Sequence, residues 1–263
     1  MSPRPLRFAT INTWKNEGDY EARLGALAIG LEELRPDVLL LQEVFRALDG
    51  TADTGRALAG ELGLELAYAP ARRKLRRWHG QDVPSESGLA VLVRGDIDAL
   101  DRVALPSDER GGERIALFVR ATSATGATMM VCCTHLSHLR GDSARRREQL
   151  DAVLAHEWWR QPARMRILGG DFNATVDSPE LSWLAMHQEL RLTDVFPADA
   201  ARRVTHPMPA RIGRAARCID FLFTVTPRGE PAQVVRRAAV ALAAPIGGVW
   251  PSDHAGIFAD VGP

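Results

Sequence analysis

Residues 88–136 decide the fold class, because three apolar runs follow one another there: GLAVLVR (88–94), RIALFVR (114–120) and TMMVCCTHL (128–136). Each run is short, rich in apolar and β-branched residues and flanked by polar or turn-forming residues, which is typical of a buried strand. We interpret their order as hairpin-like pairs of strands. This segment therefore predicts a sheet that contains antiparallel neighbours.

Further strands and helices are expected on both sides of this segment. Six more β-rich runs lie at residues 6–11, 37–42, 165–171, 219–225, 233–242 and 255–261. Four helices are expected at residues 20–34, 51–62, 142–157 and 178–188. Strands outnumber helices, and hairpin-like pairs mix with β-α-β units, which indicates a layered α/β sandwich. The two halves share an order of helix, strand and acidic residue that ends at Glu43 and at Asp171.

The size and composition of the chain indicate one large domain over residues 1–263. Of the 263 residues, 46% are hydrophobic, and no low-complexity linker divides them. Lys+Arg and Asp+Glu both number 33, so no net field draws the whole molecule onto a polyanion, and a DNA-coating role is disfavoured. Nothing in the sequence implies a protein partner.

The cysteines and the N-terminus indicate a cytoplasmic location. Cys132, Cys133 and Cys218 are odd in number and two are adjacent, so a secreted disulfide framework is not expected. The N-terminal residues lack the apolar core of a signal peptide, and no apolar run approaches the roughly 20 residues of a transmembrane helix.

Polar side chains of a few chemical types stand at or beside the ends of the expected strands. They are Asn12, Glu43, His135, Asp171, Asn173, Asp220, Asp253 and His254. A single carboxylate after a strand is usually a cap or turn former, but their joint occurrence indicates a shared site at the rim of a sheet. Oxygen donors of this kind suit Mg²⁺ or Mn²⁺, whereas the Cys/His spacing of a structural zinc site is missing. Phosphoester hydrolysis needs a cation, a group that readies water and a means of stabilising the leaving oxygen, and this set contains all three.

Seven ordered segments carry a resemblance to a known family. They are INTW (11–14), LLLQEVF (39–45), CTHL (133–136), LGGDFNAT (168–175), LTDVFP (192–197), CIDFLF (218–223) and WPSDHAGIFADV (250–261). In this order they resemble the motifs of the endonuclease/exonuclease/phosphatase superfamily, and they cover nearly the entire chain. GGDFN followed by IDF and then SDH is the most specific part. The resemblance implies a four-layer αββα sandwich, with two mixed, mainly antiparallel sheets packed face to face and helices outside.

The resemblance also implies a metal side of the site. Glu43 would be the principal ligand of Mg²⁺ or Mn²⁺, Asn12 would orient metal-bound water or phosphate, and Asp253 would complete this side.

Five further residues would carry the chemistry. Asp171 would hold or deprotonate the attacking water, or protonate the leaving group, and Asn173 would fix the phosphate in line. His254 would contact the scissile phosphate and be polarised by Asp220, and His135 would act on the phosphate or the leaving group.

Structural roles are the alternative for several residues. Asp220 and His254 can form a purely structural hydrogen bond, and His135 can be a satisfied core histidine. Asp194 in LTDVFP is interpreted as structural support. The other histidines give no comparable indication of function, and we expect a solvated or packed role for His138, His156, His187 and His206.

Two departures from the family pattern narrow the branch. The repair-type apurinic endonucleases carry an acidic residue where this chain has Trp14, and a tyrosine where it has His135. His135 instead resembles the branch with pancreatic deoxyribonuclease, the sphingomyelinases, and the inositol-phosphate and nucleotide phosphatases. The basic segment ARRKLRRWHG (71–80) could bind a polyanion or a phosphorylated headgroup through Arg76 and Trp78, although a solvated basic loop is the plainer interpretation.

Three hypotheses follow. The first is an intracellular metal-dependent phosphodiesterase or phosphatase on a phosphorylated small-molecule or lipid-like substrate. The second is a nuclease on DNA or RNA that grips the backbone with residues 72–78. The third is a non-catalytic binding module, whose signature would be erosion of Glu43, Asp171 or His254, and all three residues are present.

Overall fold

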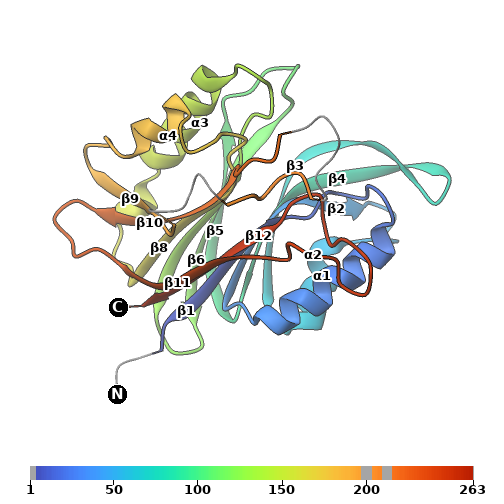
Figure 1. The fold of residues 1–263 in the computed structure, drawn as a ribbon, viewed down its shortest axis with the longest axis horizontal. Coiled ribbons are helices and arrows are strands. Elements are labelled where there is room, and N and C mark those ends of the chain that lie inside the picture. Colours follow the sequence, from blue (N-terminus) through green and yellow to red (C-terminus); the bar gives the residue numbers. More distant parts are fainter. Residues whose placement is uncertain (1–3, 197–202, 209–214, 263) are drawn as a thin grey trace.

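The computed structural model describes residues 4–196, 203–208 and 215–262, so Pro197 at the end of the LTDVFP segment lies outside the described residues. Two six-stranded sheets pack face to face, and helices cover their outer faces (Figure 1). Each sheet is mixed and mainly antiparallel. The sandwich expected from the sequence is confirmed.

The first sheet has the strand order β11-β12-β1-β2-β4-β3. Its strands are β1 (Leu6–Asn12), β2 (Val38–Ala47), β3 (Glu65–Trp78), β4 (Gln81–Val93), β11 (Val234–Ala241) and β12 (Gly256–Gly262). Only β1 and β2 are parallel, which is the pairing that needs a crossover helix.

The second sheet has the order β5-β6-β7-β8-β10-β9. Its strands are β5 (Gly95–Leu105), β6 (Arg114–Ser123), β7 (Thr128–His135), β8 (Met165–Asp171), β9 (Leu190–Asp194) and β10 (Asp220–Pro227). Here β7 and β8 are the parallel pair. Both sheets therefore centre on one parallel pair with two further strands on each side, in line with the similar order of the two halves of the sequence.

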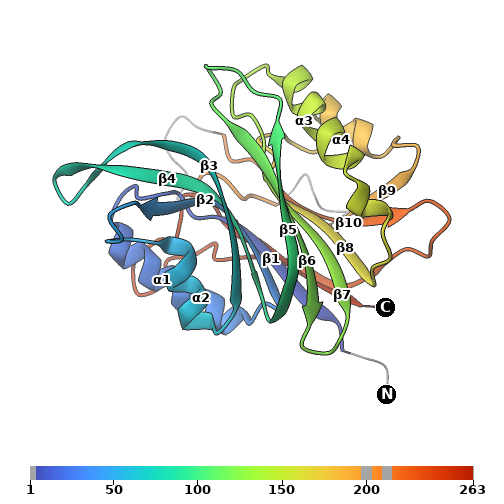
Figure 2. The same cartoon turned by 180° about the vertical axis from the view of Figure 1, so that it is seen from behind.

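Helices α1 (Tyr20–Leu34) and α2 (Thr54–Leu62) cover the first sheet, and α3 (Ser143–Ala155) and α4 (Pro179–Leu184) cover the second (Figure 2). A short 3₁₀ helix, Glu157–Arg160, follows α3. The caps explain where the first two helices begin, because Asp19 and Asp53 accept hydrogen bonds from the backbone N–H three residues further on.

The main core lies between the two sheets. Leu40 and Val91 of the first sheet meet Leu117 and Ile167 of the second in one buried cluster, and none of the four is more than 1% exposed. Two further clusters lie between each sheet and its helices. The site described below lies at one end of this sandwich, where both parallel pairs terminate.

Three strands were not expected from the sequence, and all three are edge strands. They are β3, β5 and β9. An edge strand is exposed along one side and carries polar residues, so its apolar pattern is weak. The expected pairing of residues 88–94 with residues 114–120 is wrong, because β4 and β6 belong to different sheets and β5 lies between them in sequence.

Candidate active site

The carboxyl ends of the two parallel pairs open into one cleft of about 900 Å³. Asn12 ends β1, and His135 and Asp171 end β7 and β8 opposite each other in register. The loop before β12 adds Asp253 and His254. Parallel pairing thus gathers residues that lie far apart in the sequence.

A β-bulge in β2 directs Glu43 into the cleft. Gln42 and Glu43 lie opposite the single residue Leu89 of β4, because the register shifts between Leu41 and Val44. Glu43 has a φ of 56°, a left-handed conformation that is uncommon for residues other than glycine. Its carboxylate is 2.7 Å from Nζ of Lys15, and the side chain is 15% exposed.

Asp171 is the centre of a polar network on the floor of the cleft. Its side chain accepts hydrogen bonds from Nδ2 of Asn12 at 3.2 Å and from the backbone N–H of Asn173 at 2.9 Å. Nε2 of His135 lies 3.4 Å and Nε2 of His254 lies 3.8 Å from its Oδ2 atom. Asp171 is only 2% exposed, so these groups replace water around its carboxylate.

Gly170 explains how β8 brings Asp171 so close to β7. Its φ is 141°, and a Cβ atom at this position would lie 1.9 Å from the carbonyl oxygen of Thr134. No other residue fits here without moving the backbone. The glycine of the GGD segment is therefore required for the position of the catalytic candidate that follows it.

A buried Asp220–His254 pair connects the two sheets. Nδ1 of His254 is 2.9 Å from Oδ2 of Asp220, which begins β10 and is fully buried. Ser252 fixes the loop that carries His254, because its hydroxyl donates to the carbonyl of Asn12 and accepts from the backbone N–H of His254. The imidazole is held with Nε2 toward Asp171.

The surroundings move the pKa values of three groups in different directions. Burial, together with the charge of Asp220, raises the pKa of Asp171 to about 7. Burial opposes the charged form of His254, but the charge and hydrogen bond of Asp220, together with the charges of Asp171 and Asp253, outweigh burial and raise the pKa of His254 to about 10. Burial and the nearby Arg114 lower the pKa of His135 well below its ordinary value. The two imidazoles are therefore in opposite protonation states near neutral pH, which is a recurring feature of acid-base sites.

A family model described as the Endonuclease/Exonuclease/phosphatase family matches residues 9–254. The chain belongs to this family. Its members are generally phosphoester hydrolases that depend on a divalent metal. A comparison with curated proteins found no match.

Solved structures show the same fold. An endonuclease/exonuclease/phosphatase from Beutenbergia cavernae DSM 12333 has a TM-score of 0.73 and 25% identity, over 99% of this chain and 72% of that one. A family protein from Bacteroides vulgatus has a TM-score of 0.74 and 20% identity, over 98% and 99%. TDP2 from D. rerio, complexed with single strand DNA product, has a TM-score of 0.74 and 18% identity, over 98% and 99%.

The donor atoms in the cleft fit the divalent metal on which the endonuclease/exonuclease/phosphatase family depends. Carboxylates of Glu43 and Asp253 and the amide of Asn12 line it, and such oxygen donors suit Mg²⁺ or Mn²⁺. Within the described residues, two sets of ligand atoms lie within 4.8 Å of one another: Asp171, Asp220 and His254, and His206, Asp253 and His254. Glu43 belongs to neither set and pairs with Lys15 instead.

Besides His135, three residues were expected to contact the substrate: Asn173, Arg76 and Trp78. Asn173 lines the cleft, whereas Arg76 and Trp78 do not. Nδ2 of Asn173 donates to the carbonyl of Leu136. Arg76 is 7% exposed and donates to the hydroxyls of Ser85 and Ser87. Trp78 is 8% exposed, and its ring packs against the rings of Tyr20, Phe45 and His79, so burial removes it from the surface on which a base could stack.

The basic segment at 71–80 is a strand and turn of the β3-β4 hairpin, not a loop. Two of its five basic side chains form ion pairs within the hairpin, because Arg73 pairs with Glu86 and Arg77 lies 3.5 Å from Asp82. Arg72 is the basic residue of the segment that lines the cleft, next to Ala71.

Several cleft residues were not expected from the sequence. They include Lys15, Arg114, His138 and His206. Lys15 adjoins the INTW motif, which is the only signal that pointed to it, and His206 lies in a segment without strand or helix periodicity. Arg23 also supports the site, because its guanidinium donates to the carbonyls of Thr13 and Pro251 and so joins two of the loops around the cleft.

None of the helices in the described part of the chain has the length and apolarity that a membrane span requires.

Asp194 accepts hydrogen bonds from the guanidinium of Arg203 and from the backbone of Phe196, which are contacts of a structural residue.

Proposed function

We propose that the protein is a divalent-metal-dependent phosphoester hydrolase, a phosphodiesterase or phosphatase, in which water attacks phosphorus in line. The position of Asp171 carries the proposal. This buried carboxylate has a pKa of about 7 and faces Asn12, His135 and His254 at the floor of an open polar cleft. A group with a pKa near neutrality is suited to take up and release a proton at that pH.

Glu43 is the main candidate to hold Mg²⁺ or Mn²⁺, with Asn12 and Asp253 beside it. The bound cation would supply Lewis-acid stabilisation of negative charge on the phosphate oxygens. The Lys15–Glu43 ion pair supports this assignment, because it identifies Glu43 as a carboxylate that already attracts a cation.

Asp171 takes the proton from the attacking water or gives it to the leaving oxygen, according to the side on which the ester binds. The hydrogen bond from Asn12 fixes the orientation of the Asp171 carboxylate, which lines the cleft. Asn173, whose backbone N–H donates to Asp171, would fix the phosphate in line.

The two histidines stabilise the phosphate in different ways. His254 is charged because of Asp220, and its Nε2–H offers a charge-assisted hydrogen bond to a phosphate oxygen. His135 is neutral and contributes a hydrogen bond to the phosphate or the leaving group.

The substrate class we favour is a phosphorylated small molecule or a lipid-like phosphoester. Basic side chains line the cleft around the acidic floor: Lys15, Arg72, Arg114, Arg140 and Arg217. Cations arranged around one cleft suit a compact anion, whereas the internal ion pairs of Arg73 and Arg77 weaken the case for an extended backbone grip along β3.

A nuclease is the second candidate function. It is favoured by the similarity in fold to D. rerio TDP2, whose structure contains a single strand DNA product. A plasmid-nicking assay with Mg²⁺ or Mn²⁺ tests it, and no cleavage at micromolar enzyme would remove it. A non-catalytic binding module is the remaining alternative, and turnover of any ester would exclude that role.

The experiment for the main proposal is a screen of aryl phosphomonoesters and phosphodiesters, nucleotides, phospholipids and DNA with Mg²⁺ and with Mn²⁺. We expect hydrolysis of at least one small phosphoester, and the same reaction lost in Asp171→Asn. A folded wild-type protein that binds Mn²⁺ and hydrolyses none of these would contradict the proposal.

A further inference from the structure

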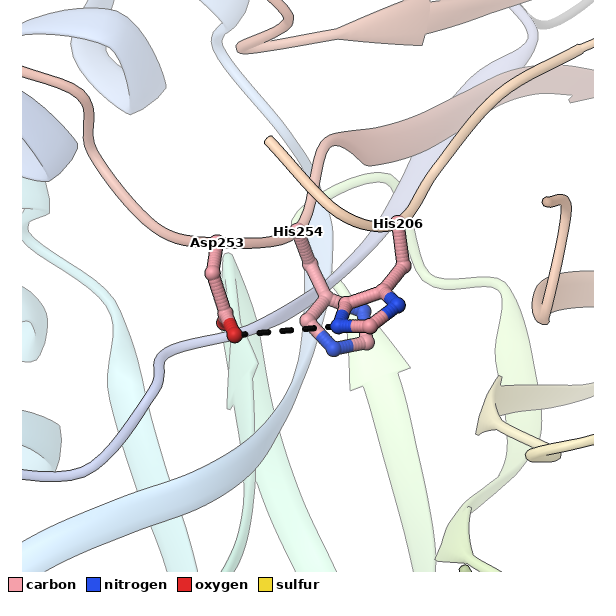
Figure 3. Close-up of side chains that lie close together, drawn as sticks. All are labelled: His206, Asp253 and His254. Atoms are coloured by element: carbon pink, nitrogen blue, oxygen red, sulfur yellow. Dashed lines mark ion pairs between the residues drawn. The ribbon is translucent and has the colours of Figure 1, made fainter. Parts of the chain in front are cut away.

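His206 is one of four histidines that line the cleft, and it lies beside Asp253 and His254 (Figure 3). Its ring lies 4.4 Å from the ring of His254, at an angle of 42°. His206 is 9% exposed, and its Nδ1 atom has no hydrogen-bond partner among the described residues. A buried imidazole next to a carboxylate and a second imidazole requires an explanation.

The spacing of these side chains is too long for hydrogen bonding but suits shared metal ligands. Nε2 of His206 is 3.7 Å from Oδ2 of Asp253. Two ligand atoms that each lie about 2.1 Å from one cation are about 3 to 4 Å apart. One ligand atom each from His206, Asp253 and His254 lies within 4.8 Å of the others.

The surroundings of His254 follow the pattern of a metal-binding histidine. Such a histidine generally uses its second ring nitrogen for a hydrogen bond to a carboxylate, which fixes the tautomer and the orientation of the ring. Nδ1 of His254 makes this bond with Asp220 at 2.9 Å, so Nε2 is the nitrogen left for a ligand.

The segment that carries His206 is fixed against the loop of the other two residues. The backbone N–H of Met208 donates to the carbonyl of Asp253 at 2.6 Å, and that of Ala255 donates to the carbonyl of Thr205 at 2.7 Å. His206 itself exchanges two backbone hydrogen bonds with Arg217. The three side chains are thus set in place by backbone pairing, as a binding site requires.

We propose that His206, Asp253 and His254 form a binding site for a divalent transition metal ion, such as Zn²⁺ or Co²⁺. Two imidazole nitrogens and one carboxylate are the donors that these ions prefer, whereas Mg²⁺ prefers oxygen. The site differs in chemistry from the oxygen donors around Glu43. A Zn²⁺ ion bound here would take the place of the proton on Nε2 of His254, which is released to solvent, so it would compete with the role of His254 on the phosphate.

The inference shares Asp253 and His254 with the proposed hydrolysis, and in that respect it rests on the proposed function. Its test measures binding without substrate. We suggest titrating the metal-free protein with Co²⁺ and recording the visible absorption of the bound ion in wild type, His206→Phe, Glu43→Gln and His79→Phe. The phenylalanine at 206 keeps a ring against His254 and removes the ligand nitrogen, and His79 is an exposed histidine that serves as the matched control.

We expect His206→Phe to weaken Co²⁺ binding about tenfold or more, and the other two variants to bind as wild type does. Unchanged binding in His206→Phe, or loss of the visible band in Glu43→Gln, would overturn the proposal. Circular dichroism shows whether each variant is folded.

A second measurement uses the wild-type protein alone. On addition of one equivalent of Zn²⁺, we expect the imidazole NMR signals of His206 and His254 to shift together, and shifts confined to other histidines would contradict the site.

Inhibition separates this inference from the proposed function. If a phosphoester is hydrolysed with Mg²⁺, micromolar Zn²⁺ should inhibit wild type more strongly than His206→Phe, by about tenfold in concentration. Equal inhibition would refute the His206 site and leave hydrolysis standing. If no ester is hydrolysed but Co²⁺ binding depends on His206, the metal site stands and the proposed hydrolysis fails.

Discussion

Two parallel strand pairs, β1–β2 in the first sheet and β7–β8 in the second, end at the same cleft but present their carboxylates differently. Glu43 leaves β2 from a bulge, is 15% exposed on its side chain and pairs with the ammonium of Lys15. Asp171 ends β8, is 2% exposed, and lies among Asn12, His135 and His254. Similar strand arrangements therefore produce two different electrostatic environments.

The difference indicates a division of tasks. A carboxylate whose partner is a flexible lysine can exchange that partner for another cation at a small cost in free energy. A buried carboxylate that is held by fixed polar groups instead changes its proton affinity, as Asp171 does. We infer that the first sheet is prepared for cation binding and the second for proton transfer, and four experiments test this contrast.

Removal of divalent metal should have the largest effect. We expect EDTA to reduce hydrolysis to the background rate and Mg²⁺ or Mn²⁺ to restore it, because the donors around Glu43 are oxygens. Turnover of an activated aryl phosphodiester before and after chelation measures this. Restoration by Zn²⁺ alone would show that the assignment of oxygen ligands is wrong.

Asp171→Asn should lower turnover by about 10²- to 10⁴-fold, the size expected for loss of a general acid-base group. The amide keeps the shape of the carboxylate, but it replaces one accepting oxygen by an NH₂ donor and cannot take up the proton. The kcat on the same aryl diester measures this, and Asp177→Asn, a change at an exposed residue outside the cleft, is the control. Equal rates in Asp171→Asn and wild type would end the role assigned to Asp171.

Lys15→Met should raise the affinity for metal, whereas loss of a metal ligand would lower it. The ammonium of Lys15 pairs with the Glu43 carboxylate when no metal ion is bound. Removing this ammonium should therefore tighten Mn²⁺ binding about two- to fivefold, as expected for a partly exposed ion pair. Binding can be measured by calorimetry without substrate. Lys74→Met removes an equal charge without touching Glu43 and is the control; weaker binding in Lys15→Met would contradict the exchange.

The stability of the metal-free protein should fall between pH 7 and pH 10. The pKa of His254 is raised to about 10 in the folded protein, so its stabilisation is present below its ordinary value of 6.5 and is lost as pH rises through 10. Asp171 also has a raised pKa, but its contribution is lost by about pH 7. We expect the decrease in Tm above pH 7 to be smaller in His254→Gln than in wild type.

An equal decrease in both proteins would show that the Asp220–His254 pair does not control stability in this range. His79→Gln removes an exposed histidine and should follow the wild-type curve.

The central strands and the polar residues at their carboxyl ends could be predicted from the sequence. Runs such as residues 128–136 and 165–171 are apolar because both faces of these strands are covered, and their polar residues stand out at the ends. The edge strands could not be found in this way, since β5 alternates exposed and half-buried residues over most of its length. Local pattern also could not separate residues 88–94 and 114–120 into two sheets, because the partner of a strand depends on the whole fold.

Side chains whose role depends on distant contacts were the hardest to predict. Trp78 stands among basic residues in the sequence, but Tyr20 and Phe45 enclose its ring in the fold. His206 has no motif around it and reaches the cleft through backbone pairing with Arg217 and with the loop before β12. Neither neighbourhood is encoded by residues close in sequence.

The bulge in β2 makes the length of this strand a determinant of function. Side chains alternate between the faces of a regular strand, so a chain that lacks Gln42 would pair with β4 without interruption and turn the Glu43 carboxylate away from the cleft. Insertions and deletions of a single amino acid at this point are therefore expected to abolish the proposed hydrolytic activity, even where every charged group is retained.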